Sequence, residues 1–292
     1  MKIAIYGKRL EENYFSFVQL LFQKLLEKKV EVVVHQSFYE DLSDKLSLDS
    51  RLKTFASHDD INDVNYMFSI GGDGTLLKTI TFVRDKNIPI LGINTGRLGF
   101  LTSIATEEID GAIDDILSDN FNLDTRTLLS LETGNNLFGD INYALNEITL
   151  QKKDTSSMVT IQVYLGEDFL NSYWADGLII STPTGSTAYS LSCNGPIILP
   201  GSGNIIVTPI APHNLNVRPI VIPDDTELTL KIAGRTENFL VALDSRSLTV
   251  PLSIELKIKK AAHQINLIRL KKYSFLNTLR TKLIWGQDKR NY

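Results

Sequence analysis

The segment Gly71-Gly72-Asp73-Gly74-Thr75 combines a permissive backbone with a single carboxylate. It follows the apolar run 66–70 and precedes a helical pattern at 76–83. Glycines let a backbone approach a ligand closely, and the N–H groups that open a helix attract phosphate. A carboxylate would repel phosphate, so we expect Asp73 either to accept a proton from an attacking hydroxyl or to hold a metal ion. The alternative is structural, because Asp-Gly is a common turn and Asp caps helices.

The segment matches neither of two widespread nucleotide loops. No Gly-Lys-Ser/Thr follows it, and its glycine spacing differs from G-x-G-x-x-G. Its position at the end of a strand of an α/β sheet is nevertheless where ligands bind in such folds. We therefore interpret Gly71, Gly72, Gly74 and Thr75 as a phosphate loop of another type.

A second polar segment, 182–190, reads T-P-T-G-S-T-A-Y-S and follows the apolar strand pattern 178–181. Its hydroxyl groups can both donate and accept hydrogen bonds, which suits sugars and amides as well as phosphates. Small residues leave room for a flat ring, and Tyr189 is able to close over one. The alternative is a plain turn before a short helix capped by Ser186.

Two further polar pairs stand at the ends of expected strands, Asn146-Glu147 and Asp176-Gly177. An asparagine side chain can recognise the amide-like edge of a base. Glu147 and Asp176 can each accept hydrogen bonds from a ribose diol, as acidic residues do in dinucleotide sites. Each of them could instead be an ordinary turn or surface residue.

The elements that must position these residues fall into two kinds. Up to about residue 120, strand patterns at 3–6, 30–34, 66–70 and 88–93 alternate with helical patterns at 14–26, 76–83 and 107–117, which predicts a parallel sheet covered by helices on both faces. Strand patterns then follow one another at 127–132, 142–150, 159–165, 169–174, 177–181, 205–209, 227–232 and 239–243, and only 186–191 appears helical, which predicts an all-β region.

We therefore predict an α/β plus all-β protein with an N-terminal Rossmann-like domain and a β-rich, sandwich-like domain. The first domain is expected at 1–120 and the second at 121–270. The last helical pattern, 273–285, predicts that segment 271–292 returns to the first domain.

Composition restricts the function. A chain of 292 residues with 43% hydrophobic and 22% charged residues is typical of a globular protein. A net charge of −4 without a basic stripe disfavours nucleic acid as partner. The single cysteine, Cys193, fits a reducing compartment; it could be a nucleophile, but a lone cysteine is more often a small apolar residue. No apolar run is long enough to span a membrane or to form a signal peptide, so we expect a cytoplasmic protein.

Both motifs together resemble those of the NAD kinase family over nearly the whole chain. The resemblance rests on G-G-D-G-T at 71–75, L-G-I-N-T-G-R-L-G-F-L at 91–101, Asn146-Glu147, Asp176-Gly177 and T-P-T-G-S-T-A-Y-S at 182–190. The ordered set is specific, although the first motif alone also occurs in lipid kinases and phosphofructokinases. The resemblance implies an α/β domain for ATP and phosphate binding and a β-rich domain for NAD binding.

The resemblance also implies roles for residues. Asp73 is the expected base on the 2′-hydroxyl of the adenosine ribose of NAD. The implied NAD-binding residues are Asp73, Gly74, Lys78, Asn146, Glu147, Asp176, Thr187, Ala188, Tyr189, Ser190, Leu191, Ser192 and Ala211. ATP and NAD are the implied substrates, with Mg²⁺ as the expected divalent metal cation and unknown metal ligands. A homodimer or homotetramer is expected.

One departure from the family pattern concerns Asp244-Ser245-Arg246, where many relatives carry Asp-Gly-Gln or Asp-Gly-Arg. A serine replaces a glycine in a turn, which puts a substrate contact from Arg246 in doubt. Two other functions remain open at this point: a lipid kinase of the diacylglycerol or sphingosine type, and a non-catalytic NADP-binding sensor that would not need Asp73.

Overall fold

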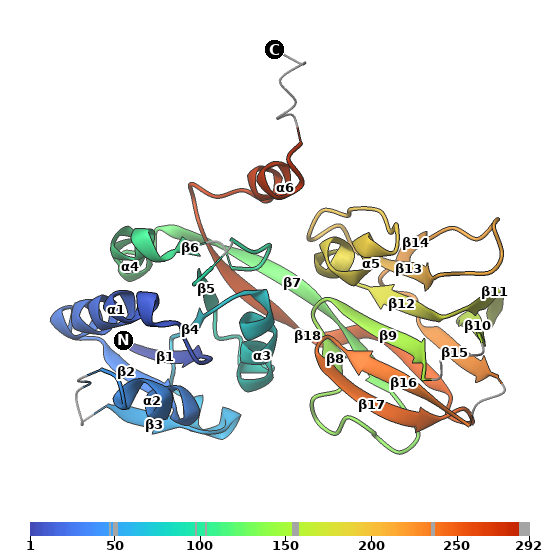
Figure 1. Ribbon diagram of the computed structural model, residues 1–292, viewed down its shortest axis with the longest axis horizontal. Coiled ribbons are helices and arrows are strands. Elements are labelled where there is room, and N and C mark those ends of the chain that lie inside the picture. Colours follow the sequence, from blue (N-terminus) through green and yellow to red (C-terminus); the bar gives the residue numbers. More distant parts are fainter. Residues whose placement is uncertain are drawn as a thin grey trace, which may run out of the picture. The chain divides into compact units, whose positions relative to one another are not determined.

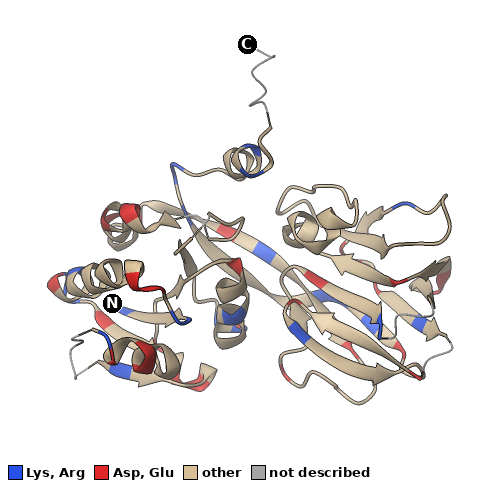
Figure 2. Ribbon diagram, in the orientation of Figure 1, with Lys and Arg blue, Asp and Glu red and all other residues tan. Residues whose placement is uncertain are grey.

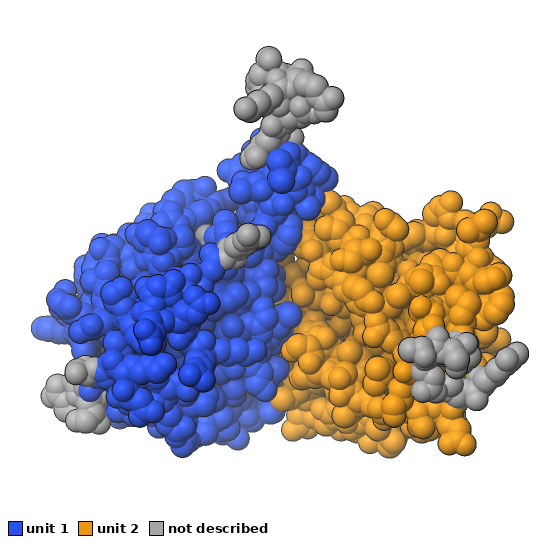
Figure 3. Space-filling model, in the orientation of Figure 1, with its two compact units in different colours: residues 1–125, 265–292 blue, residues 126–264 orange. Residues whose placement is uncertain are grey.

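The computed structural model describes residues 1–46, 48, 52–96, 98–102, 104–153, 158–234 and 237–285. The chain divides into two compact units, residues 1–125 with 265–292 and residues 126–264 (Figure 3). Two long strands, β7 (Phe121–Glu132) and β18 (Leu256–Leu270), have residues in both units.

Unit 1 is built on a parallel sheet with the strand order β5-β4-β1-β2-β3 (Figure 1). Its strands are β1 (Lys2–Gly7), β2 (Glu31–His35), β3 (Lys53–Phe55), β4 (Tyr66–Ile70), β5 (Ile90–Asn94) and the short β6 (Ile104–Ala105). β6 pairs with β5 in parallel, and the C-terminal part of β18 pairs with β5 through Leu267 and Ile90.

Helices cover both faces of this sheet, as predicted. The helices are α1 (Phe15–Glu27), α2 (Gln36–Ser43), α3 (Asp73–Val83), α4 (Ile109–Leu117) and α6 (Phe275–Leu283). Apolar residues of α1, α2 and α4 share one core with Ile3, Ile5, Phe68 and Ile70. α3 lies on the other face, where Thr79 Oγ1 donates to Ser69 Oγ at 2.8 Å. Because both faces are buried, the strands are nearly continuous apolar runs.

Unit 2 consists of two antiparallel sheets. One sheet contains β10 (Val159–Leu165), β11 (Asp168–Ala175), β15 (Leu228–Ala233) and the N-terminal part of β18, with β7 and β8 (Tyr143–Ala144) beside it. The other has the order β14-β13-β12-β9-β16-β17. Its strands are β9 (Glu147–Lys152), β12 (Gly177–Ser181), β13 (Asn204–Ile210), β14 (Ile220–Pro223), β16 (Asn238–Leu243) and β17 (Arg246–Pro251).

Alternating side chains of both sheets form one core, so the predicted sandwich-like arrangement is confirmed. Ile161, Val163 and Leu230 of the first sheet share this core with Leu150 and Leu178 of the second. The sequence patterns missed α2, β3, β6, β14, β17 and β18. The helical pattern at 186–191 is a 3-10 helix, Thr184–Thr187, followed by α5, Tyr189–Ser192.

Among the described residues, no helix has both the length and the apolar character needed to cross a membrane.

Candidate active site

The glycine segment connects β4 directly to α3. Gly71 has a φ of +146°, a left-handed value that side chains disfavour. A Cβ at this position would also lie 2.4 Å from Thr75 Oγ1. Its N–H donates to Ile93 O at 2.9 Å. The chain itself therefore requires glycine at 71, and α3 begins two residues later with Asp73.

The Asp73 carboxylate is held by the segment 100–102. Oδ2 accepts a hydrogen bond from Phe100 N at 2.8 Å. Oδ1 accepts from Leu101 N at 3.1 Å, from Thr102 N at 2.9 Å and from Thr102 Oγ1 at 2.9 Å. A carboxylate offers about four acceptor positions, two on each oxygen. Oδ1 is saturated by these contacts, and Oδ2 keeps one position open.

A second layer of contacts fixes the segment that holds Asp73. Thr102 is fully buried, and its hydroxyl accepts from Asn94 Nδ2 at 2.8 Å. Asn94 Oδ1 in turn accepts from Gly96 N at 2.7 Å. At Gly99 a Cβ would lie 1.8 Å from Asp73 Oδ1, so any side chain there would displace the carboxylate. The motif at 91–101 thus positions Asp73, although its Arg97 lies outside the described residues.

Lys78 lies on α3 beyond the first turn, with its ammonium 5.6 Å from the centroid of the Phe82 ring. Tyr6, His35, Phe55 and Phe82 form an aromatic cluster here. Burial, reinforced by the charge of Lys78, lowers the pKa of His35. Lys78 is thus associated with this aromatic cluster.

In unit 2, three strand ends meet at one edge of the second sheet. Glu147, the first residue of β9, pairs with Ser181, the last of β12. Ile148 pairs with Leu243, the last residue of β16. The residues that follow β12 and β16 therefore converge on Asn146-Glu147, which brings both polar segments predicted from sequence together.

Asp244 fixes the backbone of this edge. Its carboxylate accepts hydrogen bonds from Leu145 N at 2.9 Å, Asn146 N at 2.8 Å and Glu147 N at 3.3 Å. Burial raises the pKa of Asp244, while these backbone bonds and the charge of Arg246 oppose the change. Sequence reasoning missed this role, because the contact joins residues almost 100 positions apart.

Arg246 is engaged within the protein. Its guanidinium donates to the carbonyl oxygens of Ile141 and Tyr143 and lies over the Tyr143 ring. Ser245 replaces glycine without a left-handed φ, since the left-handed position of the turn is Asp244, at +52°. The departure from the family pattern is therefore accommodated, and Arg246 supports the strand that precedes Asn146.

Glu147 is a buried carboxyl with an unpartnered oxygen. Its residue is only 8% exposed, and Oε2 has no hydrogen-bond partner among the described residues. Burial, with the nearby charge of Asp244 as the second cause, raises the pKa of Glu147 to about 8. Buried polar atoms are nearly always hydrogen-bonded, so Oε2 is ready to form a hydrogen bond with a ligand hydroxyl.

The segment after β12 is tied to this edge. Thr182 Oγ1 donates to Leu145 O at 2.6 Å and accepts from Gly185 N at 3.1 Å. A Cβ at Gly185 would lie 2.1 Å from Asn146 O. Ser186 does not cap the following helix, because its hydroxyl donates to Pro183 O and accepts from Ile198 N. The alternative that Ser186 caps the following helix is therefore wrong.

The remaining residues of this segment differ in how they face their surroundings. Tyr189 OH accepts from Gln151 Nε2 at 2.9 Å, so its ring follows β9 away from Glu147. Ser190 is fully buried and shares a hydrogen bond of 2.9 Å with Thr208 Oγ1, so it supports the fold. The partly or fully exposed residues of the set are Thr187, Ala188, Tyr189, Leu191 and Ser192.

Asp176 lies at the other end of β12. Its carboxylate forms an ion pair with Lys152 at 2.6 Å, and its N–H donates to Ile210 O. Ala211 follows Ile210, is exposed and has a φ of +43°. Four residue steps along β12 separate Gly177, next to Asp176, from Ser181, about 13 Å. The described site in unit 2 is therefore elongated, as an extended ligand requires.

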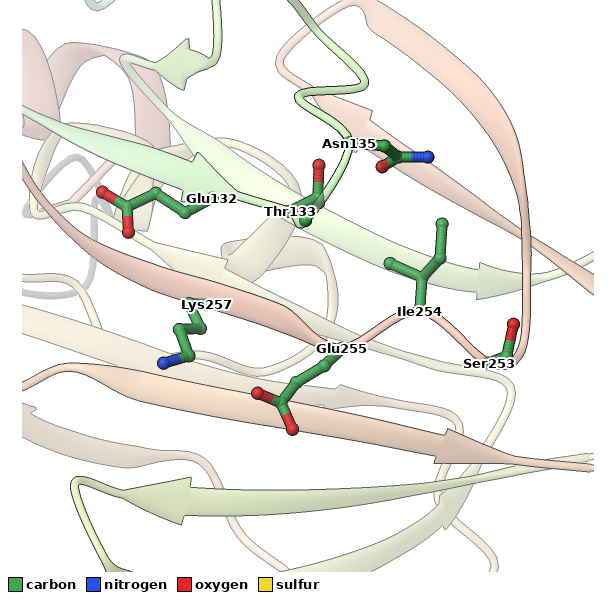
Figure 4. A pocket seen from close by; sticks show the side chains of 8 residues that line it. Glu132, Thr133, Asn135, Ser253, Ile254, Glu255 and Lys257 are labelled. Carbon is green, nitrogen blue, oxygen red and sulfur yellow. The ribbon is translucent and has the colours of Figure 1, made fainter.

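A separate surface pocket of about 560 Å³ also lies in unit 2 (Figure 4). It is open, and two of its lining carboxylates are already paired, Glu132 with Lys259 and Glu255 with Lys231. It shares no residue with the motifs. The residues predicted from the sequence therefore lie elsewhere, in the two segments that converge on Glu147 and around Asp73.

Comparisons with known proteins identify the family of this chain. The ATP-NAD kinase N-terminal domain matches residues 3–121, and the ATP-NAD kinase C-terminal domain matches residues 145–270. An NAD kinase of Cytophaga hutchinsonii is 48% identical over 292 residues and covers both chains fully. One of Bacteroides fragilis is 45% identical over 291 residues, covering 99% of this chain and all of the relative.

Solved structures support the fold. Yeast NADH kinase complexed with NADH has a TM-score of 0.90 at 22% identity, covering 100% of this chain and 89% of that one. An NAD kinase from Archaeoglobus fulgidus in complex with ATP has a TM-score of 0.77 at 22% identity, covering 97% and 99%. Since both domain families match in order and full-length relatives share nearly half of the residues, the chain belongs to the ATP-NAD kinase family.

Proposed function

We propose that this chain transfers the γ-phosphate of ATP to the 2′-hydroxyl of the adenosine ribose of NAD, which yields NADP and ADP. The family membership and the full-length relatives called NAD kinase support this activity. The observation that carries the mechanism is the hydrogen bonding of the Asp73 carboxylate. Among the described residues, all acceptor positions of Oδ1 are occupied, and one acceptor position of Oδ2 is free.

In the proposed reaction the 2′-oxygen of NAD attacks the γ-phosphorus of ATP. Asp73 Oδ2 accepts the hydroxyl proton, the new O–P bond forms, and the bond between the γ-phosphorus and the β–γ bridging oxygen breaks, so that ADP leaves. Phosphoryl transfer asks a protein mainly for positioning and charge stabilisation. The four hydrogen bonds from segment 100–102 supply the positioning of Asp73.

We assign NAD recognition to unit 2. Glu147 Oε2 forms a hydrogen bond with a ribose hydroxyl, and Asn146 recognises the adenosine part. Asp176 contacts another part of the dinucleotide, which the 13 Å length of the site along β12 allows. Thr187, Ala188, Tyr189, Leu191 and Ser192 line the pocket, with Ala211 at its far end and Ser190 beneath it. Gly74 and Lys78 complete the proposed set from unit 1.

A divalent cation such as Mg²⁺ fits this protein only as a companion of ATP. Among the described residues, no group of three or more His, Cys, Asp or Glu side chains could hold a metal ion. Mg²⁺ is commonly bound by substrate phosphates, water and one or two carboxylates. The only carboxylate at the glycine segment, Asp73, keeps a single open acceptor position, so it would supply at most one ligand to such a cation.

The lipid kinase and the NADP-binding sensor are not favoured. Both domain matches name the NAD kinase family, and a sensor would leave the elaborate support of Asp73 without a purpose. A cytoplasmic location and a homodimer or homotetramer remain predictions.

The test of this function is an assay of the purified protein with ATP, Mg²⁺ and NAD. We expect NADP to form in proportion to enzyme and time, and no phosphorylation of diacylglycerol or sphingosine vesicles. Phosphorylation of the lipids without NADP formation would establish the lipid kinase instead. NADP binding without any ATP turnover would establish the sensor.

A further inference from the structure

The order of strands in unit 1 reverses its direction beside the glycine segment. From β1 the chain proceeds through β2 to β3 in one direction, and from β4 to β5 in the other. The direction therefore reverses between β1 and β4, which are neighbours. In open α/β sheets, ligands bind at this switch point, outside the C-terminal ends of the two strands.

The two loops at the switch point begin at paired residues of β1 and β4. They lead to helices on opposite faces of the sheet. Gly7, the last residue of β1, is paired with Ile70, the last of β4. The chain after Gly7 leads to α1, which packs on the face of Ile5 and Phe68, whereas the chain after Ile70 leads to α3 on the face of Ser69. The space between the two loops is therefore not filled by either connection.

Lys8 and Arg9 are the first residues after β1 and are exposed. Figure 2 shows the loop after β1 in the colour of Lys and Arg. No described residue forms an ion pair with either side chain, whereas Lys2, Lys24 and Lys28 in the same unit are all paired with carboxylates. The acidic residues that follow, Glu11 and Glu12, belong to the short connection into α1. Two cations without an ion pair in the described part of the chain thus follow the strand that neighbours the glycine segment.

Gly72 and Gly74 provide the second observation. Neither has a left-handed φ, and a Cβ at either position would have nothing within 4 Å. Glycine costs stability in a helix, and Gly74 lies inside α3. Nothing in the described chain requires these two glycines, in contrast to Gly71 and Gly99. A ligand that approaches the backbone closely does require them.

We infer that Lys8 and Arg9, at the switch point between β1 and β4, contact the phosphates of the donor opposite Gly72 and Gly74. This assignment rests on the proposed function and adds the donor contacts to it. Arginine forms bidentate hydrogen bonds with phosphate, and lysine neutralises it as a point charge. The first N–H groups of α3 face the same ligand, since they have no partner within the helix.

The test compares Lys8→Ala and Arg9→Ala with Lys45→Ala, an exposed lysine just after α2. We expect each of the first two changes to raise the KM for ATP on the order of tenfold or more, with the KM for NAD within twofold. Inorganic tripolyphosphate, as a competitive inhibitor without adenosine, should lose affinity to the same degree. Because KM can differ from Kd, titration calorimetry with adenylyl imidodiphosphate gives the affinity directly.

Gly72→Ala tests the other side of the proposed contact, in the glycine segment. Gly111→Ala in α4 is its control, because a Cβ would have no atom within 4 Å at either position. Gly72→Ala should keep the thermal stability of the wild type and weaken adenylyl imidodiphosphate and tripolyphosphate alike, while Gly111→Ala weakens neither.

Unchanged ATP affinity in Lys8→Ala and Arg9→Ala, with active wild type, would overturn this inference alone. Loss of ATP but not of tripolyphosphate would overturn it too, because the contact would then be to adenosine. A selective rise of the KM for NAD would place these residues at the acceptor. Failure of the wild type to form NADP would instead refute the proposed function.

Discussion

At the scale of single residues, the two acidic groups of the site are prepared for different tasks by their surroundings. Asp73 accepts four hydrogen bonds and stays partly exposed, so a position on Oδ2 remains for a proton. Glu147 is buried, lies near Asp244 and has a pKa raised to about 8. The first suits proton acceptance during turnover, and the second suits recognition of a hydroxyl donor.

The raised pKa of Glu147 predicts a dependence of stability on pH. Between its usual pKa of 4.5 and about 8, the folded protein keeps a proton that the unfolded chain has lost. The folded state then binds more protons than the unfolded state, so the free energy of unfolding falls as pH rises through this window. Glu147→Gln removes the effect. The free energy of unfolding of the variant minus that of wild type should therefore increase by roughly a few kcal/mol from pH 5 to pH 8.5.

Denaturant unfolding without NAD at both pH values measures this difference, and the comparison cancels other titrating groups. Glu167→Gln, in the exposed turn between β10 and β11, is the matched control and should show no such change. A difference between Glu147→Gln and wild type that is equal at pH 5 and pH 8.5 would contradict the account.

At the scale of elements, the site depends on a loop from one strand holding the first residue of a neighbouring helix. The local patterns predicted β4, α3 and β5 closely, since each is a clear apolar run or helical repeat. They did not predict that segment 100–102 binds Asp73, because hydrogen bonds to backbone N–H groups leave no mark in residue type. Only Gly99 carries a signal, and its meaning requires the structure.

This arrangement predicts the effect of Gly99→Ala. The new Cβ would lie 1.8 Å from Asp73 Oδ1, so the carboxylate or the loop must shift. A displacement of this kind can cost about 100-fold in rate, and we expect NADP formation to fall by that order, with the KM for NAD little changed. Gly111→Ala in α4, where space is open, is the control and should retain wild-type turnover. Wild-type turnover in Gly99→Ala would show that segment 98–102 does not position Asp73.

At the scale of the whole molecule, sequence patterns predicted a parallel α/β region, a β-rich region and a final helix in unit 1, and the structure has all three. They missed β18, although it pairs with β15 in unit 2 and with β5 in unit 1. Its apolar alternation is interrupted by Lys259, Lys260 and His263, and its pairing joins residues far apart in the chain. The contact of Asp244 with segment 145–147 escaped prediction for the same reason.

The central claim is that Asp73 accepts the proton while phosphate is transferred to NAD, and turnover of Asp73→Asn tests it most directly. The asparagine keeps the size of the side chain but is a far weaker base, so we expect NADP formation to fall about 10²–10⁴-fold. Calorimetric affinity for NAD and the thermal unfolding temperature should stay close to the wild type. Near-normal turnover of a correctly folded Asp73→Asn variant would contradict the account.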